Sequence, residues 1–409
     1  MIETEPIAPG RTRRRRNDNQ MRRARFRLLL GVALVMAGNG VLLLVFGVRA
    51  TKAGFGPSVT SLIIGAYYGG FIAGSLSAPV LVRRLATARS FMLLCTIVAA
   101  AAIAPPLFVN PFFWTFLRLM LGFSFAAMYV VVESWLNRST PNDERARVLG
   151  VYLAVVMAAF AAGSLFVPVV GTRGHAPFLL AFGLAIAGAV ATVGLPEPGF
   201  TALRAHAIGF RELVQRARLG TASTAVTGFA NAAFISSLAV WATRNGYSEA
   251  RTSVFSTMAS AGPLLIQIPL ARWSDRSTRP KVMLIVTLVA AVVSIGGALG
   301  PVNGYTPMIG IFVLGGLTYT LYSINGAETN DHLRFDEMPS AGGYLILLTG
   351  LGAIAGSITV GVATRWIGNS AMFWVVATAH VAIAALILIL GPAGVVGRSG
   401  RLAHRYSRT

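Results

Sequence analysis

Residues 271–281, A-R-W-S-D-R-S-T-R-P-K, form a basic, polar stretch between two long apolar runs. A second stretch of this kind, P-V-L-V-R-R-L-A-T-A-R at residues 79–89, lies 192 positions earlier in the same setting. The match continues backwards without a gap, pairing Arg276 with Arg84, Gly262 with Gly70, Ser253 with Ser61, Gly246 with Gly54 and Asn231 with Asn39. The chain is therefore a single unit of roughly 190 residues written twice.

The composition places this duplicated unit in a membrane. The chain has 409 residues, of which 55% are hydrophobic and only 12% are charged, which is too apolar for a soluble protein. Apolar runs of about 20 residues recur throughout, and each is long enough to cross a ~30 Å hydrocarbon layer as a helix. Backbone in lipid must satisfy its own hydrogen bonds, so these repeated runs indicate a helical bundle and not a barrel.

The pattern predicts an all-α membrane protein with twelve spans. We place them at residues 28–48, 58–82, 90–109, 112–136, 147–170, 176–195, 221–243, 252–271, 281–300, 306–326, 341–363 and 370–391. They divide the chain into a basic arm (1–27), a six-helix half (28–195), a linker (196–220), a second six-helix half (221–391) and a basic tail (392–409).

The distribution of lysine and arginine predicts the orientation. If the N-terminus is cytoplasmic, the inner segments hold 28 of these residues, the outer segments hold six, and Arg118 lies inside a span. By the positive-inside rule, this asymmetry puts both termini in the cytoplasm. We interpret the +21 net charge as a topology signal, with the basic arm attracted to anionic lipid headgroups and not to nucleic acid.

Each half holds six spans, an even number, so both halves enter the membrane in the same direction. A two-fold axis along the membrane normal would then relate them, with a central cavity between halves that can rock. The linker carries Phe210, Leu213, Val214 and Ala217 on one helical face, which predicts an amphipathic segment on the inner membrane surface.

Twelve spans in two parallel halves, with D-R-S-T-R-P-K between spans 8 and 9, resemble the major facilitator superfamily. Its loop signature, Gly-x-x-x-Asp-Arg-x-x-Arg-Lys, is followed by Asp275, Arg276, Arg279 and the nearby Lys281, with Ala271 in place of the glycine. Within the superfamily, E-S-W-L-N at 133–137 and A-E-T-N-D at 327–331 resemble the YcaD-like transporters. One departure is Arg83, which stands in the first-half loop where the second half has Asp275.

Polar side chains in the spans are the candidates for a substrate site, because burying a charge or an amide in lipid costs free energy and such a residue is often retained for function. Arg118 on span 4 either binds an anionic group or responds to a proton, or it is a structural arginine. Asn39 and Asn231 occupy equivalent points on spans 1 and 7, where they bind substrate or join adjacent helices. Tyr319, Tyr322 and Asn325 recur at every third position of span 10, which we expect to face the cavity.

Two carboxylates near the cytoplasmic ends of their spans, Glu133 and Glu328, are the candidates for gating or proton coupling. They are proton carriers or gate residues, and the resemblance favours the gate. Each would pair with an arginine of a nearby inner loop, Arg83 or Arg84 for Glu133 and Arg276 or Arg279 for Glu328. Such pairs would close the inner mouth and break when it opens.

The energy source follows from an absent motif. A P-loop needs Gly-Lys-Ser/Thr, whereas the only lysines, Lys52 and Lys281, follow Thr51 and Pro280. We therefore expect no ATP site, no cofactor, no metal and no enzyme activity. The sequence predicts a monomeric secondary transporter of a small solute in the cytoplasmic membrane, working by alternating access and coupled to protons. The alternatives are a drug or metabolite exporter of the same fold, or a receptor or assembly factor on this scaffold.

Overall fold

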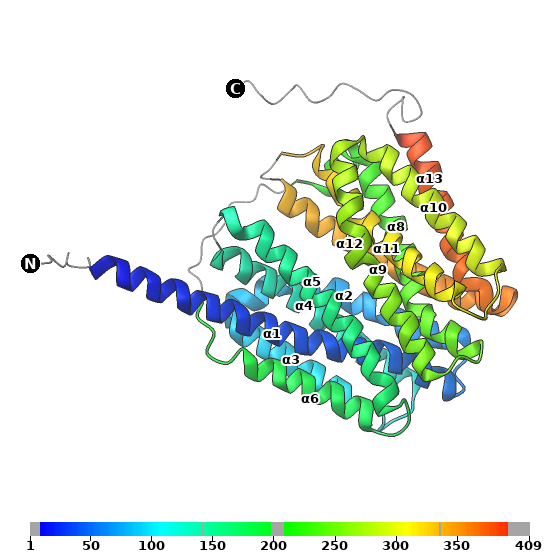
Figure 1. The fold of residues 1–409 in the computed structure, drawn as a ribbon, viewed down its shortest axis with the longest axis horizontal. Helices are drawn as coiled ribbons and strands as arrows, with labels where there is room; N and C mark the ends of the chain where they lie inside the picture. The colour runs from blue at the N-terminus through cyan, green and yellow to red at the C-terminus, as the bar shows by residue number, and fades with distance from the viewer. Residues whose placement is uncertain (1–8, 141, 198–207, 335–336, 392–409) are drawn as a thin grey trace, which may run out of the picture.

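The computed structural model describes residues 9–140, 142–197, 208–334 and 337–391, which form helices joined by short loops (Figure 1). The first half contains α1 (Pro9–Lys52), α2 (Pro57–Leu85), α3 (Thr87–Ile103), α4 (Pro111–Ser139), α5 (Asn142–Val170) and α6 (Ala176–Ala191). A short helix, α7 (Phe210–Arg216), lies in the linker. The second half contains α8 (Arg218–Arg244), α9 (Glu249–Arg276), α10 (Arg279–Leu299), α11 (Thr306–Asn330), α12 (Met338–Ile367), the 3₁₀ turn η1 (Gly368–Ser370) and α13 (Ala371–Leu390).

The helices have the lengths that a membrane requires. Within the described ranges, nine helical segments are long and apolar enough to cross one, and the last of these, Ser340–Leu390, includes both α12 and α13. The two shorter apolar helices, α3 and α6, complete a set of six in each half. This architecture confirms the expected all-α fold of twelve long helices in two six-helix halves.

The sequence repeat recurs in the backbone. Gly54 and Gly246, which are 192 residues apart, both have φ +78° just after the end of a helix. At each, the next residue donates its N–H back to the helix, from Phe55 to Ala50 and from Tyr247 to Ala242, both at 3.1 Å. This is the Schellman motif, which needs a left-handed residue and therefore favours glycine.

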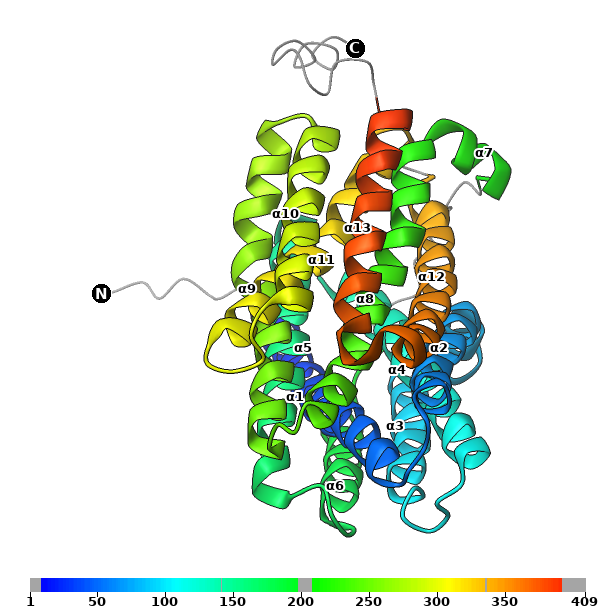
Figure 2. The ribbon, with the colours of Figure 1, turned by 90° about the vertical axis from the view of Figure 1, so that its right-hand side faces the viewer.

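Each half has its own hydrophobic core. One cluster of buried side chains extends from Ala24 to Leu195, and a second extends from Leu219 to Ile387. In Figure 2, α1–α6 occupy mainly the lower part of the view and α8–α13 mainly the upper part. Separate cores allow each half to move as a unit, because a shared core would have to be disrupted by any relative rotation.

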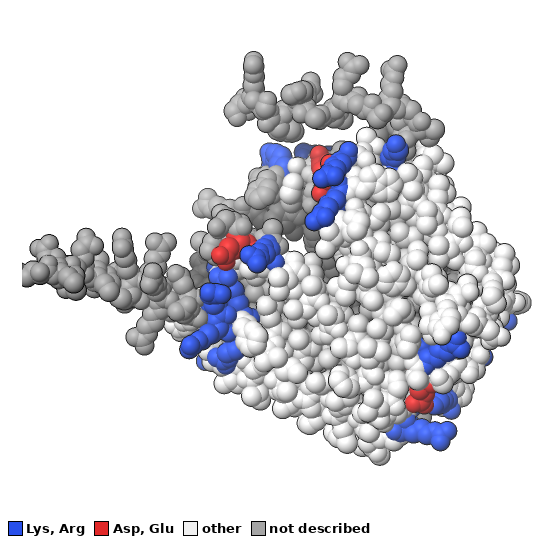
Figure 3. All heavy atoms as spheres, viewed as in Figure 1, with Lys and Arg blue, Asp and Glu red and all other residues white. Residues whose placement is uncertain are grey.

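The halves meet at one end of the molecule and diverge at the other. We call the end that carries the turns 53–56, 171–175 and 245–248 the closed end, and the end from which both chain termini leave the open end. Near the closed end Ser58 of α2 donates to the Gly361 carbonyl of α12 at 3.3 Å, and a methyl group on Gly361 would lie 2.4 Å from Ser61. On the face in Figure 3, charged side chains gather at the margins and leave a broad uncharged surface between them.

The structure adds two details at the ends of helices. The first helix begins at Pro9, well before the expected span at residue 28, so the basic arm continues the helix. The linker helix α7 buries Leu213 against Ala341 of α12, so its apolar face packs on the second half. The side chains of residues 1–19 and the expected basic tail at 392–409 lie outside the described residues.

Candidate functional site

The first polar element between the halves is Arg118, on α4. That helix begins at Pro111, and the Asn110 side chain caps it by accepting from the backbone N–H groups of Phe112 and Phe113. The cap fixes the helix register and sets Arg118 two turns inside the bundle. Arg118 is 1% exposed, which makes it one of the largest fully buried side chains.

The guanidinium of Arg118 is surrounded by aromatic rings and has no described carboxylate beside it. Its Cζ lies 4.7 Å from the Tyr67 ring centroid and 5.4 Å from the Phe46 ring centroid, both cation–π distances. Its Nε and Nη1 atoms are buried without a hydrogen-bond partner among the described residues. These two donors remain desolvated and unpaired, which costs free energy.

Two tyrosines of the first half lie beside Arg118, and a third, from the second half, lies near them. Tyr67 and Tyr68 of α2 interact electrostatically with Arg118, and Tyr68 also interacts with Tyr319 of α11. The Asn39 side chain of α1 lies near Tyr67. The structure therefore brings together Arg118, Asn39 and Tyr319, three residues that the sequence proposed separately. Tyr67 and Tyr68 were missed, although their position on a cavity-lining helix could have indicated them.

Asn231, the repeat mate of Asn39, is placed differently. It is partly buried on α8, and its Oδ1 has no hydrogen-bond partner among the described residues. The two amides occupy equivalent positions in the halves, but only Asn39 has a tyrosine hydroxyl beside it.

The three polar residues proposed on α11 do not share one environment. Tyr319 and Tyr322 face the space between the halves, where Tyr322 interacts electrostatically with Glu133 of α4. Asn325 is 0% exposed and donates to Thr227 Oγ1 of α8 at 2.8 Å, within the second half. The expectation that Asn325 faces the cavity is wrong, because a residue six positions on is rotated about 120° around a helix of 3.6 residues per turn.

Glu133 lies further along α4 toward the open end. Its carboxylate is close enough to Tyr129, Tyr152 and Tyr322 to interact with each electrostatically. Among the described residues, no ion pair joins Glu133 to an arginine, and Arg83 and Arg84 are exposed at the end of α2. Tyrosines of both halves therefore lie near this carboxylate in this conformation.

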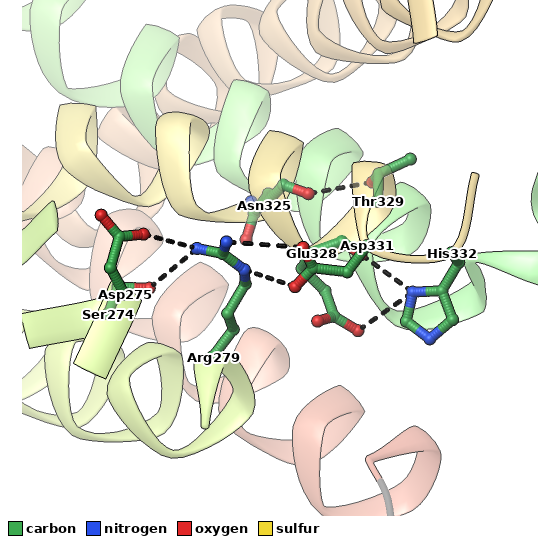
Figure 4. Close-up of polar contacts among 8 residues, drawn as sticks. All are labelled: Ser274, Asp275, Arg279, Asn325, Glu328, Thr329, Asp331 and His332. Carbon is green, nitrogen blue, oxygen red and sulfur yellow. Dashed lines mark hydrogen bonds and ion pairs between the residues drawn. The ribbon is translucent and has the colours of Figure 1, made fainter. Parts of the chain in front are cut away.

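A cluster of charges stands at the open end of the second half (Figure 4). Arg279 binds Asp331 through its Nε at 2.5 Å and Asp275 through its Nη1 at 3.3 Å. Glu328 is 7% exposed, and the basic group beside it is His332, whose Nδ1 is 3.8 Å away. The expected pairing of Glu328 with Arg279 is not made here, because the Arg279 guanidinium pairs with Asp331 at the end of the helix and with Asp275. Arg276 is exposed.

An ion pair at the closed end joins the two halves and was not anticipated from the sequence. Lys52 at the end of α1 donates to Glu249 at the start of α9 at 2.6 Å. The Thr172 N–H, in the turn after α5, donates to the same carboxylate at 2.9 Å, and the Thr172 hydroxyl also bonds to it. These contacts hold the closed end together.

Comparison with known proteins identifies the family. The profile of the Major Facilitator Superfamily matches residues 28–216 and 220–404, which is nearly the whole chain. The chain belongs to the Major Facilitator Superfamily. As a superfamily member it is a multi-pass membrane transporter and not an enzyme.

Relatives of this superfamily member are known by sequence and by structure. An uncharacterized MFS-type transporter of Yersinia pestis is 25% identical over 336 residues, covering 80% of this chain and 85% of the relative. The transporter YcaD of Escherichia coli is 23% identical over 335 residues, covering 81% of this chain and 86% of YcaD. These matches confirm the resemblance to the YcaD-like group.

Solved structures share the fold. The nucleoside transporter NupG superposes with a TM-score of 0.76 at 12% identity, covering 90% of this chain and 99% of NupG. A D-xylose-proton symporter superposes with a TM-score of 0.69 at 11% identity, covering 89% of this chain and 96% of the symporter. A bacterial homologue of the lysosomal transporter Spinster, in an inward-facing and unoccupied conformation, gives a TM-score of 0.70 at 15% identity, covering 90% and 95%.

Proposed function

We propose that this chain is a secondary active transporter of a small solute carrying an anionic group, coupled to protons and working by alternating access. The observation that carries the proposal is Arg118, a buried cation with unused hydrogen-bond donors among aromatic side chains of the first half. Binding an anion there would satisfy these donors, and a neutral solute would leave the charge uncompensated.

The proposed location is a bacterial cytoplasmic membrane with both termini inside the cell. The excess of arginine in the segments at the open end supports this orientation through the positive-inside rule. With that orientation the open end faces the cytoplasm, and the structure corresponds to an inward-facing state. The fold shared with an inward-facing transporter supports the same reading.

In the proposed cycle, Arg118 holds the anionic group while Asn39 and Tyr67 orient the rest of the solute by hydrogen bonds. The contribution of Tyr319 from the second half makes the site complete only when the halves stand close together. Moving the contact between halves from one end to the other then exposes this midplane site to each side in turn.

Proton coupling is assigned to Glu133. Its carboxylate lies near Tyr129, which interacts electrostatically with both Glu133 and Tyr67. Protonation of Glu133 would remove a negative charge from between the halves and so favour their approach at this end. A D-xylose-proton symporter shares this fold, which supports proton coupling as part of the proposal.

The test is uptake into proteoliposomes that contain the purified protein. A panel of radiolabelled small carboxylates would be presented with an imposed pH gradient. For a carboxylate that the wild type accumulates, Arg118→Ala should lower uptake by about thirtyfold or more, as expected for losing the partner of a buried charge. Arg118→Lys keeps the charge without the planar donors and should retain part of the flux.

Two further variants separate binding from coupling. Asn39→Ala should lower uptake, and Glu133→Gln should abolish accumulation driven by the pH gradient while preserving exchange of labelled for unlabelled solute. Circular dichroism and size-exclusion profiles would establish that each variant is folded. Undiminished uptake in both Arg118→Ala and Asn39→Ala would remove the site assignment.

A further inference from the structure

A cavity of about 300 Å³ lies between α2, α4 and α12, at the level where the two halves begin to diverge. Ile72 of α2 packs against Gly350 of α12 at its closed-end limit, where a methyl group on the glycine would lie 2.4 Å from the isoleucine side chain. Toward the open end the helices separate, and the cavity fills the separation. Its lining consists of Ile72, Ser75, Leu76, Pro79, Val130, Gly342, Gly343, Ile346 and Leu347.

The chemistry of this lining selects an apolar occupant. No lining residue carries a charge, and Ser75 is the sole lining residue with a side-chain hydroxyl. An aliphatic chain would bury its surface against Ile72, Leu76 and Ile346 and would leave no buried polar group unpaired. A strongly polar solute would find almost no hydrogen-bond partner in this cavity.

One face of α2 connects the cavity to Arg118. Tyr68, Ile72, Ser75 and Pro79 recur at intervals of four, three and four residues, so they lie on one face of the helix. Tyr68, at the start of this row, interacts electrostatically with Arg118 and Tyr319. Seven residues, from Tyr68 to Ser75, span about 10 Å of helix. Arg118 and the cavity therefore lie alongside the same helix, α2, with the Ile72–Gly350 contact at the limit of the cavity nearer Arg118.

We propose that the cavity holds the aliphatic chain of the transported solute, whose anionic group binds at Arg118. The substrate class is then an amphipathic monoanion with an unbranched aliphatic chain, such as a medium-chain carboxylate. This inference rests on the proposed transport function and deepens it by naming the solute. A bilayer lipid tail is the alternative occupant, but the face of α2 that lines the cavity also carries Tyr68, which interacts with a buried cation that has unused donors.

The test measures binding of a homologous series to the protein in nanodiscs. Radiolabelled butanoate, hexanoate and octanoate, with 1-octanol as the uncharged comparison, would be titrated by equilibrium dialysis, with empty nanodiscs subtracted. In the wild type, affinity should rise about fourfold per methylene. Octanoate should bind at least tenfold more tightly than octanol, and Arg118→Ala should remove that preference.

The decisive variant fills the cavity without disturbing the fold. A Cβ atom at Gly343 would meet open space, so Gly343→Leu adds apolar volume at the cavity lining, and Gly342→Leu is a second variant of the same design. The matched control is Gly183→Leu on α6, where an added side chain also meets open space but lies outside the cavity. Gly343→Leu should abolish the gain between butanoate and octanoate, and Gly183→Leu should preserve it.

Each result decides between the proposals. A gain with chain length that survives both Gly343→Leu and Gly342→Leu would overturn the cavity assignment. So would a phospholipid that copurifies with the wild type, is lost in Gly343→Leu and is not displaced by octanoate. Butanoate binding that depends on Arg118 but does not improve with chain length would overturn this inference and leave the proposed function standing. Failure of every carboxylate to bind would overturn both.

Discussion

Glu249 is the residue on which the contact at the closed end depends most. Its carboxylate accepts from Lys52 and from the Thr172 N–H, so one side chain of the second half binds two segments of the first. The side chains of Lys52 and Glu249 are 38% and 30% exposed, so solvent screens the pair and its contribution is up to about 1 kcal/mol. A pair of this strength biases an equilibrium between states without preventing exchange.

We expect Glu249→Gln to shift the protein toward the state that is open at this end, by about two- to fivefold in population. Spin labels on His175→Cys and Asn303→Cys, two exposed positions on the turns of opposite halves, would report the distance by pulsed electron paramagnetic resonance. A longer-distance component should grow in the variant. Lys52→Met should produce a similar shift, and the double variant should add little more, because both changes remove one interaction. Fully additive shifts would contradict the pairing.

The sequence indicates residues that stand out within their own stretch of the chain or within the repeat. Arg118 was found because a charge in an apolar run is conspicuous, and Asn39 because the repeat duplicates it. The bond between Lys52 and Glu249 joins residues 197 positions apart in different halves, and no periodicity or spacing encodes it. Asn325 was misplaced because spacing along a helix was interpreted without its angular consequence.

At the scale of helices, hydropathy predicts where a span crosses lipid but not where its helix begins. All twelve spans were found, yet α1 extends back to Pro9 and α11 continues to Asn330. Arginine is a good helix former, so a basic segment can continue a helix beyond the apolar run. The charged network lies on and just past this extension, where Asp331 at the C-cap of α11 pairs with Arg279.

The contact between α7 and α12 depends on a carboxylate outside the membrane spans. Glu337, which is 3% exposed, accepts from the Arg334 N–H at 2.9 Å and pairs with Arg216 of α7 at 3.2 Å. The Arg334 backbone N–H, followed by the Arg334 and Arg216 charges, lowers the pKa of the Glu337 carboxyl below its ordinary value of 4.5. A lowered pKa means that this contact is fully present above pH 4.5 and is lost as the pH falls through the lowered value.

A nitroxide on Gln215→Cys, an exposed position of α7, would report this loss. We expect an immobilised spectrum at neutral pH that becomes mobile only below pH 4.5, the ordinary carboxyl value. Glu337→Gln should be mobile throughout. The matched control is Glu212→Gln, because Glu212 pairs with Arg216 within α7 and does not reach α12. A Glu337→Gln spectrum that stays immobilised at neutral pH would show that apolar packing alone holds α7.

At the scale of the whole molecule, the two halves are joined differently at the two equivalent corners of the closed end. The repeat pairs Lys52 with Arg244 and places Pro57 where the second half has Glu249, so only one corner can form the ion pair. At the other corner α2 and α12 are in close contact through Gly361 and Gly65. Opening this end must therefore break a polar contact at one corner and a closely packed one at the other.

The closely packed corner offers a way to arrest the whole movement. A Cβ atom on Gly65 of α2 would lie 3.1 Å from the Ser357 Cβ of α12. A disulfide needs about 3.5–4.5 Å between Cβ atoms, so a shift of a few tenths of an ångström would allow one. The native Cys95 is buried and should not compete. We expect Gly65→Cys/Ser357→Cys to cross-link on oxidation and to lose transport, with recovery after reduction.

The two single-cysteine variants control for the substitutions themselves, and both should transport under oxidising conditions. Because α2 and α12 belong to different halves, a covalent bond at their contact prevents the closed end from separating. Under alternating access, every turnover requires that separation. Flux that continues in a fully cross-linked sample would mean that solute crosses without the halves parting at this end, and the rocking mechanism would have to be abandoned.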